Sequence, residues 1–364
     1  MKVKEISAYI ESIAPLSLQE SYDNAGLLVG SPELEASAAL ICLDSTEEVI
    51  DEAVKRGCNL VIAHHPIIFS GLKKINGKNY VERAVIKAIQ NNVAIYAAHT
   101  NLDNVRQGVN ARIAQRLGLR NCRILSPRIG LLRKLVTFCP VEKADTVRQA
   151  LFAAGAGHIG NYDQCRFNTE GFGTFRGGEE TNTYVGKKGK QHREKEQRIE
   201  TIYPVSIEHQ VLKALFASHP YEEVAYDIYP LANTFPLAGS GMTGELEKEL
   251  TEGTFLKRLK TAMKAGGIRH TALLGKKIRK VAVCGGAGSF LLKDAIASGA
   301  DAYVSADFKY HEFFDADKRI LVADIGHYES EQFTGALFYD LLKEKFPTFA
   351  VHLSKTNTNP INYL

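Results

Sequence analysis

Hydrophobic and polar positions alternate between two kinds of segment in the first third of the chain. The short, almost continuous apolar runs AALICL (38–43), NLVIAH (59–64) and VAIYAAH (93–99) are typical of buried strands. The segments that follow, such as STEEVIDEAVKRG and NYVERAVIKAIQNN, place apolar residues at helical spacing. Apolar strands separated by helices predict a parallel sheet that is covered on both faces.

This alternation stops in the middle of the chain and resumes later. From 126 to 239 the pattern predicts a strand, a helix, a strand, a glycine-rich and then basic loop, a strand, a helix and a strand, which is a ferredoxin-like arrangement. After 240, apolar runs such as KVAVCGG (280–286) again alternate with helical segments. We therefore predict an α/β fold with parallel or mixed sheets covered by helices, in a discontinuous core domain (1–125 and 240–364). An α+β ferredoxin-like domain (126–239) is inserted into it.

Composition and charge exclude several classes of protein. The 364 residues suit two domains, and 45% hydrophobic with 24% charged residues are ordinary globular values. The formal net charge is only +4, and Glu194 and Glu196 interrupt the basic run at 186–198, which favours an exposed loop over a nucleic-acid-binding patch. No stretch approaches the ~18 apolar residues of a membrane span. We expect a cytoplasmic protein without a nucleic-acid or membrane partner.

The six cysteines are scattered along the chain, and no CxxC pair occurs among them. Disulfides and a thiolate zinc site are therefore disfavoured, and buried free thiols are expected.

Polar side chains with metal-binding chemistry follow the predicted strands. His64 and His65 come after the second apolar run, and His99 and Asp103 come after the third. The carboxyl ends of parallel strands lie at one edge of a sheet, so these side chains are expected to converge. Asp44 follows the first run in the same way.

A second group lies near the end of the chain. His327 follows the apolar run RILVADIG, and Glu331 lies four residues later, so an imidazole and a carboxylate can share one face of a helix. Five nitrogen and oxygen ligands exceed the needs of one four-coordinate ion but suit two divalent ions, about 3.5–4 Å apart. The sequence thus predicts two ions, zinc, manganese, iron or cobalt, held by five residues: His64, His65, Asp103, His327 and Glu331.

Each element taken alone has a simpler explanation. The doubled histidine could be an accident of a strand end, Asp103 a turn or helix cap, and the pair at 327 and 331 a capping contact. His99 is a candidate sixth ligand, general acid or partner of a ligand, with the last of these favoured.

A glycine turn in VAVCGGAGSF (281–290) offers a possible anion site. A strand, a glycine turn and a helix start can hold phosphate, which makes Gly285, Gly286 and Gly288 candidate binding residues. The spacing matches neither the dinucleotide nor the P-loop motif, so close approach of the backbone to a neighbour is the favoured explanation.

Six segments in order, SYDNAGLLVG (21–30), VIAHHPIIF (61–69), HTNLDN (99–104), CGGAGSF (284–290), SADFKYHE (305–312) and DIGHYESE (324–331), resemble the Nif-three-like family. Its members are often catalogued as GTP cyclohydrolase 1 type 2 homologues. The resemblance implies that the five residues above are the ligands of a dinuclear metal centre. It also implies a middle insert similar to PII or CutA domains, and a homo-oligomer that is a toroidal hexamer.

Two hypotheses about function follow. In the first, the chain is a metal-dependent hydrolase of a small molecule or nucleotide. One form of this hypothesis is a GTP cyclohydrolase-like reaction, in which metal-activated water attacks the purine. In the second, it is a non-enzymatic metal-binding regulatory or scaffold protein. A nucleotide screen on metal-loaded protein would distinguish them.

Overall fold

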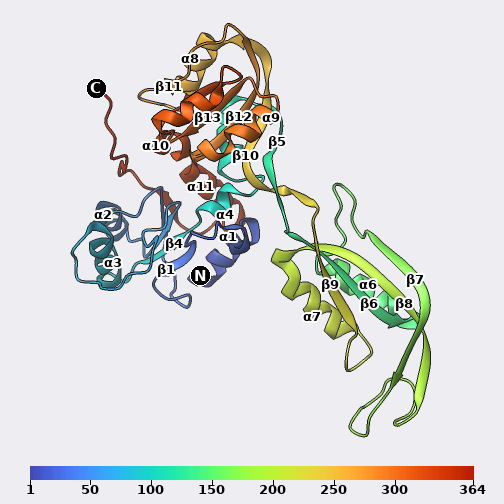
Figure 1. The fold of residues 1–364 in the computed structure, drawn as a ribbon. Coiled ribbons are helices and arrows are strands. Elements are labelled where there is room, and N and C mark those ends of the chain that lie inside the picture. Colours follow the sequence, from blue (N-terminus) through green and yellow to red (C-terminus); the bar gives the residue numbers. More distant parts are fainter. The chain divides into compact units, whose positions relative to one another are not determined.

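The computed structural model describes residues 1–364, which form two compact units. The core unit comprises residues 1–127 and 236–364, and the insert unit comprises residues 128–235. The predicted α/β class with helix-covered sheets is confirmed, since two mixed sheets and their helices make up the core unit (Figure 1). None of the helices combines the length and the apolar character needed to span a membrane.

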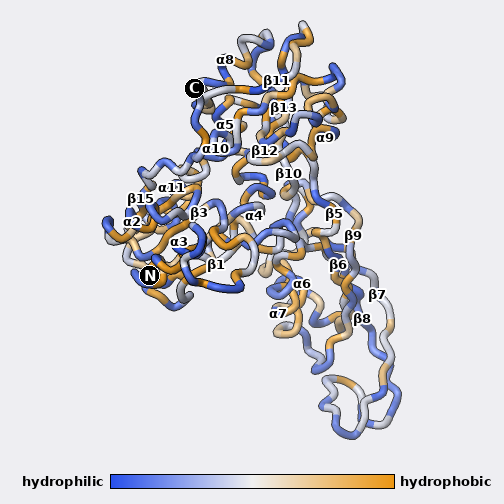
Figure 2. The backbone as a smooth tube through the Cα atoms, turned by 60° about the vertical axis from the view of Figure 1, so that its left-hand side comes forward, coloured by the Kyte–Doolittle hydropathy of each residue, from blue (hydrophilic) through white to orange (hydrophobic).

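The first core sheet has the strand order β1-β4-β3-β2-β15. Strands β4, β3, β2 and β15 are parallel, and β1 pairs antiparallel with β4 at one edge. The apolar runs of the sequence form its centre, and β3 is visible as a hydrophobic stretch in Figure 2. The bounds are β1 (Gly26–Val29), β2 (Ala39–Cys42), β3 (Leu60–Ala63), β4 (Ala94–Ala97) and β15 (Val351–Leu353).

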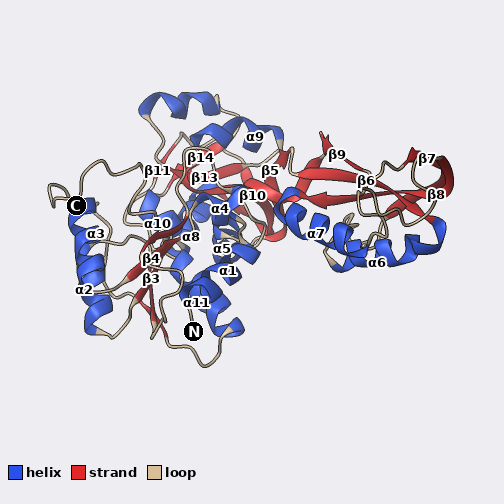
Figure 3. Cartoon of the chain, turned by 90° about the horizontal axis from the view of Figure 1, so that it is seen from below, coloured by secondary structure: helices blue, strands red, loops and turns tan.

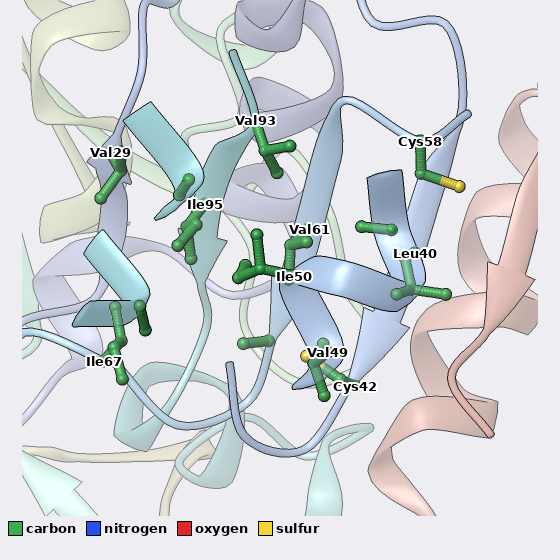
Figure 4. Packing of buried hydrophobic residues seen from close by; sticks show 14 of the residues in the cluster. Val29, Leu40, Cys42, Val49, Ile50, Cys58, Val61, Ile67, Val93 and Ile95 are labelled. Carbon is green, nitrogen blue, oxygen red and sulfur yellow. The ribbon is translucent and has the colours of Figure 1, made fainter. Parts of the chain in front are cut away.

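Helices cover this sheet because their apolar faces pack onto it. Val49 and Ile50 of α2 lie in one buried cluster with Leu40, Val61 and other strand residues (Figure 4). Helix α3 packs on the same cluster, whereas α11 contacts β2 and β15. The helices of this part are α1 (Val3–Ile13), α2 (Glu47–Lys55), α3 (Tyr80–Gln90), α4 (Thr100–Asp103), α5 (Val109–Leu117) and α11 (Thr334–Lys345).

The second core sheet has the order β11-β14-β13-β12-β10-β5. Strands β12, β13 and β14 are parallel, while β11 and β10 pair antiparallel with their neighbours. The bounds are β5 (Arg120–Ile129), β10 (Thr234–Thr251), β11 (Arg269–His270), β12 (Lys277–Ala287), β13 (Ala302–Ala306) and β14 (Leu321–Asp324), with helices α8 (Glu252–Ala262), α9 (Leu292–Ala297) and α10 (His327–Glu331). Helix α5 contacts both β12 and α11, so it links the two halves of the core unit.

The insert unit has the element order β6, α6, β7, β8, α7, β9 and the sheet order β7-β8-β6-β9, with every pair antiparallel. Figure 3 shows α6 and α7 lying along this sheet, where their apolar residues enclose a separate buried cluster. The bounds are β6 (Leu132–Pro140), α6 (Ala144–Ala153), β7 (Arg166–Arg176), β8 (Gln191–Pro204), α7 (Glu208–Ser218) and β9 (Tyr226–Leu231).

The basic run at 186–198, expected to be an exposed loop, becomes strand β8 from Gln191 onward. The prediction was wrong for this part because β8 pairs with the whole of β7, from Gln191 opposite Arg176 to Thr201 opposite Arg166. Cross-strand pairing of this kind cannot be recognised from the charge pattern of one strand.

Candidate metal centre

The ends of strands from both core sheets supply the predicted ligands. His64 and His65 directly follow β3, and Asp103 ends the short helix α4 that follows β4. His327 and Glu331 begin and end α10, which follows β14 of the second sheet. The structure thus brings together all five residues that the sequence singled out, although they span more than 260 positions of the chain.

One group of donors consists of His64, Asp103 and Glu331. The Nε2 atom of His64 lies 3.6 Å from Oδ1 of Asp103 and 3.8 Å from Oε1 of Glu331. His64 is fully buried, and neither its Nε2 nor Oδ1 of Asp103 has a hydrogen-bond partner. Buried polar atoms without partners are costly, and these two face each other at a distance that suits a shared cation.

A second group consists of His65, His327 and Glu331. Oε2 of Glu331 lies 2.9 Å from Nε2 of His65 and 3.1 Å from Nε2 of His327. The two Nε2 atoms lie 3.4 Å apart. Each oxygen of Glu331 therefore lies in a different group of donors, so this carboxylate belongs to both groups.

The two adjacent histidines, His64 and His65, do not approach the same oxygen of Glu331. Their ring planes are tilted by 41°, with centroids 5.0 Å apart, and their Nε2 atoms approach different oxygens of Glu331. The residue before a proline favours an extended backbone, so Pro66 helps His65 leave the strand.

A hydrogen bond to Nδ1 orients each of the three imidazoles. His64 donates to the backbone carbonyl of Ala98 at 2.9 Å, His65 is paired with Asp44 at 2.7 Å, and His327 is paired with Asp307 at 2.7 Å. Such bonds fix the tautomer that leaves Nε2 free to bind a metal. Thr358 in turn donates to the other oxygen of Asp44 at 2.5 Å.

The electrostatics without ions show how strongly the carboxylates attract positive charge. Although burial opposes it, hydrogen bonds to Asp44 and Glu331 raise the pKa of His65 to about 9. The pKa of His327 is raised to about 11 against burial, chiefly by the charge of Glu331. Burial and the charge of Glu331 raise the pKa of Asp103 to about 8. Each donor group combines imidazole nitrogen with carboxylate oxygen, a set that suits divalent cations, so the residues present fit a metal site.

His99 lies beside this cluster and is held by Asp23. Its ring centroid is 5.3 Å from that of His64 and 5.4 Å from that of His65, and its Nδ1 lies 2.8 Å from Oδ1 of Asp23. Burial opposes ionisation of Asp23, but hydrogen bonds with His99 and Thr100 lower its pKa to about 2. His99 also forms a donor group with His64 and His65, so a role as ligand and a role beside the ligands both fit its position.

Sequence reasoning missed Asp23 and Asp307 as partners of these imidazoles. Both belong to segments that carry the family resemblance, SYDNAGLLVG and SADFKYHE, but neither segment has a spacing that predicts pairing with a distant histidine. Asp44 was noted at a strand end without a role, and it proves to orient His65.

The glycine turn packs against the metal cluster. The amides of Gly285 and Gly286 donate to side chains of the protein, Asn110 at 3.0 Å and Ser330 at 2.9 Å. Gly286 has φ +61°, and a Cβ there would lie 2.5 Å from Oε1 of Glu331. Gly288 lies against Ser305 in the same manner. These contacts require glycine for close approach, and anion binding by the turn stays a prediction.

A cavity of about 410 Å³ opens above His65, His99, Asp103, His327 and Glu331. Its rim carries three exposed aromatic rings, those of Tyr22, Phe69 and Phe290. Tyr22 and Phe69 have centroids 6.2 Å apart. Pockets of this size bind small molecules, and aromatic rims favour planar ligands.

Comparison with known proteins places these features in context. The model of the Duf34/NIF3 (NGG1p interacting factor 3) family matches residues 1–360. A protein of Halalkalibacterium halodurans named "GTP cyclohydrolase 1 type 2 homolog" is 41% identical over 97% of this chain and 96% of its own length. A protein of the same name from Bacillus subtilis is 37% identical over 99% of this chain and 98% of its own. A solved structure, a Bacillus cereus protein related to NIF3, matches with TM-score 0.86 and 40% identity, covering 100% of this chain and 99% of that one.

Proposed function

Because the chain belongs to the Duf34/NIF3 family, we propose that it is a dinuclear metal-dependent hydrolase whose substrate is a small planar molecule such as a purine nucleotide. The name of its relatives, GTP cyclohydrolase 1 type 2 homolog, supports the substrate class, and the site geometry supports the metal dependence.

The observation that carries the proposal is the pair of buried atoms without partners. Nε2 of His64 and Oδ1 of Asp103 face each other beside one oxygen of Glu331, while the other oxygen faces two further imidazoles. A purely structural hydrogen-bond network would pair these atoms, because leaving them unpaired costs about 1–3 kcal/mol each. Two cations, each with three donors from the chain, satisfy every one of them.

Two divalent ions held by these residues would supply a water of lowered pKa and a positive field that polarises the substrate. His99 contributes a proton-transfer group beside them, because Asp23 binds its Nδ1 and leaves Nε2 facing the cluster. As the imidazolium, a ring oriented in this way can give the proton on Nε2 to a leaving nitrogen or oxygen of the substrate, and it then becomes the neutral tautomer with its proton on Nδ1. The buried carboxylate of Asp23 holds the ring in that tautomer.

The aromatic rim gives a reason for a planar substrate. Tyr22 and Phe69 stand on one side of the cavity mouth, and Phe290 follows the glycine turn. Rings at these positions can stack on a purine and place it above the cluster.

The test is a screen of nucleotides and phosphoesters on protein loaded separately with zinc, manganese, iron or cobalt. We expect turnover of at least one purine nucleotide that requires metal, a fall of at least ~10²-fold in His99→Gln, in line with general acid–base catalysis, and no turnover in His64→Ala. Activity that persists in metal-free protein would overturn the proposal. Tight binding of two ions with no product from any substrate would instead favour a regulatory or scaffold role.

A further inference from the structure

The insert unit contains a cavity of its own, separate from the metal cluster. It has a volume of about 610 Å³ and is lined by strand β7, by the loop at 177–184 and by the segment 221–225 before β9. All of its lining residues belong to the insert unit, so the cavity is defined within that unit alone. A volume of this size suits a small organic molecule.

A buried carboxylate lies in the wall of this cavity. Glu196 is only 8% exposed, and its Oε1 accepts a hydrogen bond of 2.8 Å from the hydroxyl of Tyr221. No group of the protein donates to its Oε2, and no lysine or arginine forms an ion pair with it. A buried carboxylate without a counter-ion is unfavourable, because removing its charge from water costs several kcal/mol.

The nearby cations are engaged elsewhere. Lys195, next to Glu196 in the strand, pairs with Glu170 at 2.8 Å, and Arg198 pairs with Glu200 at 3.0 Å. Four carboxylates but only two guanidinium groups line the cavity, Glu170, Glu196, Glu222 and Glu223 against Arg176 and Arg198. The only lining charge that is buried is thus negative, and this favours a positively charged occupant.

Aromatic rings stand around the carboxylate. The ring of Tyr221 lies 6.0 Å from that of Phe175 and 6.3 Å from that of Tyr184, measured between centroids. Tyr221 is held in place by His219, which accepts from the Tyr221 amide through Nδ1 and pairs through Nε2 with the carbonyl of Phe138. Rings of this kind around an anionic group are the features that bind ammonium groups, since the ring faces are negative.

Gly173 provides the space that the carboxylate occupies. A Cβ at this position would collide with Oε2 of Glu196, whereas the glycine leaves the wall open there. The backbone of β7 therefore approaches the carboxylate closely at Gly173, while β7 itself contributes the ring of Phe175 and other lining segments contribute those of Tyr184 and Tyr221.

We propose that the insert unit is a binding module for a small organic cation, in which Glu196 pairs with an ammonium group and Phe175, Tyr184 and Tyr221 surround the apolar body of the ligand. This site goes beyond the proposed hydrolase, because none of its residues belongs to the metal cluster. It gives the insert a ligand of its own, by which the protein would sense an amine.

A matched pair of probes tests the charge requirement on the full-length protein. Tyramine carries an ammonium group, and tyrosol replaces that group with a neutral hydroxyl on the same phenolic skeleton. By calorimetry or ligand-observed NMR, we expect tyramine to bind at least ~10-fold more tightly than tyrosol, as ion pairing with a buried carboxylate implies. Glu196→Gln, which keeps the size of the side chain, should abolish this preference, and Glu247→Gln, at an exposed ion pair with Arg120 outside the cavity, should retain it.

A second variant keeps the test informative if Glu196→Gln fails to fold. Tyr184→Ala removes an exposed ring of the enclosure, so it should weaken tyramine binding several-fold without altering the thermal midpoint of the protein. Equal affinities for tyramine and tyrosol, or no binding of either, would overturn the proposal. If the unaltered protein binds no tyramine and Glu196→Gln changes the oligomeric state, the proposal is also overturned, because the cavity would then be an interface between two copies of the chain.

Discussion

Replacing Glu331 with glutamine tests whether a single carboxylate serves two ions. Glu331→Gln keeps the side chain's size but removes the charge that faces both donor groups, whereas Asp103→Asn affects only the group that contains His64. The structure therefore predicts different stoichiometries. The wild type should bind two ions per chain, Asp103→Asn one and Glu331→Gln close to none.

The expected loss of metal affinity follows from the number of donor atoms at each ion. Each ion has three donors from the chain, and losing one of them should cost more than the 10–100-fold that loss of a supporting partner typically costs. At a free metal concentration ten times the wild-type Kd, a 100-fold weaker site falls from about 90% to about 10% occupancy. The change is therefore large enough to count ions directly.

The assay is elemental analysis after chelator-treated protein is equilibrated with zinc or manganese at that concentration. Asp340→Asn is the control, because this carboxylate is exposed and pairs with Arg112 at the surface. Parallel loss of metal in Asp103→Asn and Glu331→Gln, or retention of two ions in both, would refute the bridging role of Glu331.

Three further outcomes are expected. Asp307→Asn should weaken the ion held by His327 by 10–100-fold, or about 1.4–2.7 kcal/mol, in metal titrations, while saturating metal restores two ions. Gly286→Ala should lower thermal stability by ~1–3 kcal/mol and impair metal binding, because its φ of +61° and the nearby Glu331 leave no room for a Cβ. Burial raises the pKa of Glu52, but hydrogen bonds with Ser354 and its neighbours outweigh this effect and lower the pKa to about 2. Up to about 3 kcal/mol of stability should therefore be lost as the pH falls from 4.5 to 2, and acid unfolding would measure this loss.

A specific result would contradict each of these three predictions. Unchanged affinity in Asp307→Asn would mean that the hydrogen bond does not orient His327, and a fully stable Gly286→Ala would mean that the turn relaxes freely. The pKa of Glu52 is lower in the folded protein than in the unfolded chain, so its carboxylate stabilises the fold above pH 4.5 and loses this effect as the pH falls. Glu52→Gln should therefore unfold with a weaker pH dependence between 4.5 and 2, and identical curves would exclude this carboxylate as the cause.

The sequence predicted that the five candidate ligands come together because they follow apolar strands, and the carboxyl ends of parallel strands share an edge. The partners that orient these ligands could not be predicted in the same way. Asp23 meets His99 across 76 positions, and Asp307 reaches His327 from a different strand end, so both pairings depend on tertiary structure.

The burial of Glu196 in the insert unit could not be predicted from the sequence. Glu196 was noted only as an acidic interruption of a basic run, because its neighbours in sequence are charged and polar. Its burial depends on the nearby Gly173 of the paired strand β7 and on Tyr221, which lies beyond helix α7. A charge pattern along one segment carries no information about which of its side chains another segment covers.

The bond between His65 and Glu331 closes a loop of 266 positions that contains the whole insert. The entropic cost of closing a loop rises only with the logarithm of the loop's length, so doubling the length adds about 0.6 kcal/mol to this cost. The insert less than doubles this loop, so its presence makes assembly of the metal centre harder by less than that amount. Gain or loss of a domain at this point of the chain should therefore change the free energy of assembling the metal centre very little. Two ions bound as proposed would act as a cross-link between the early and late parts of the chain.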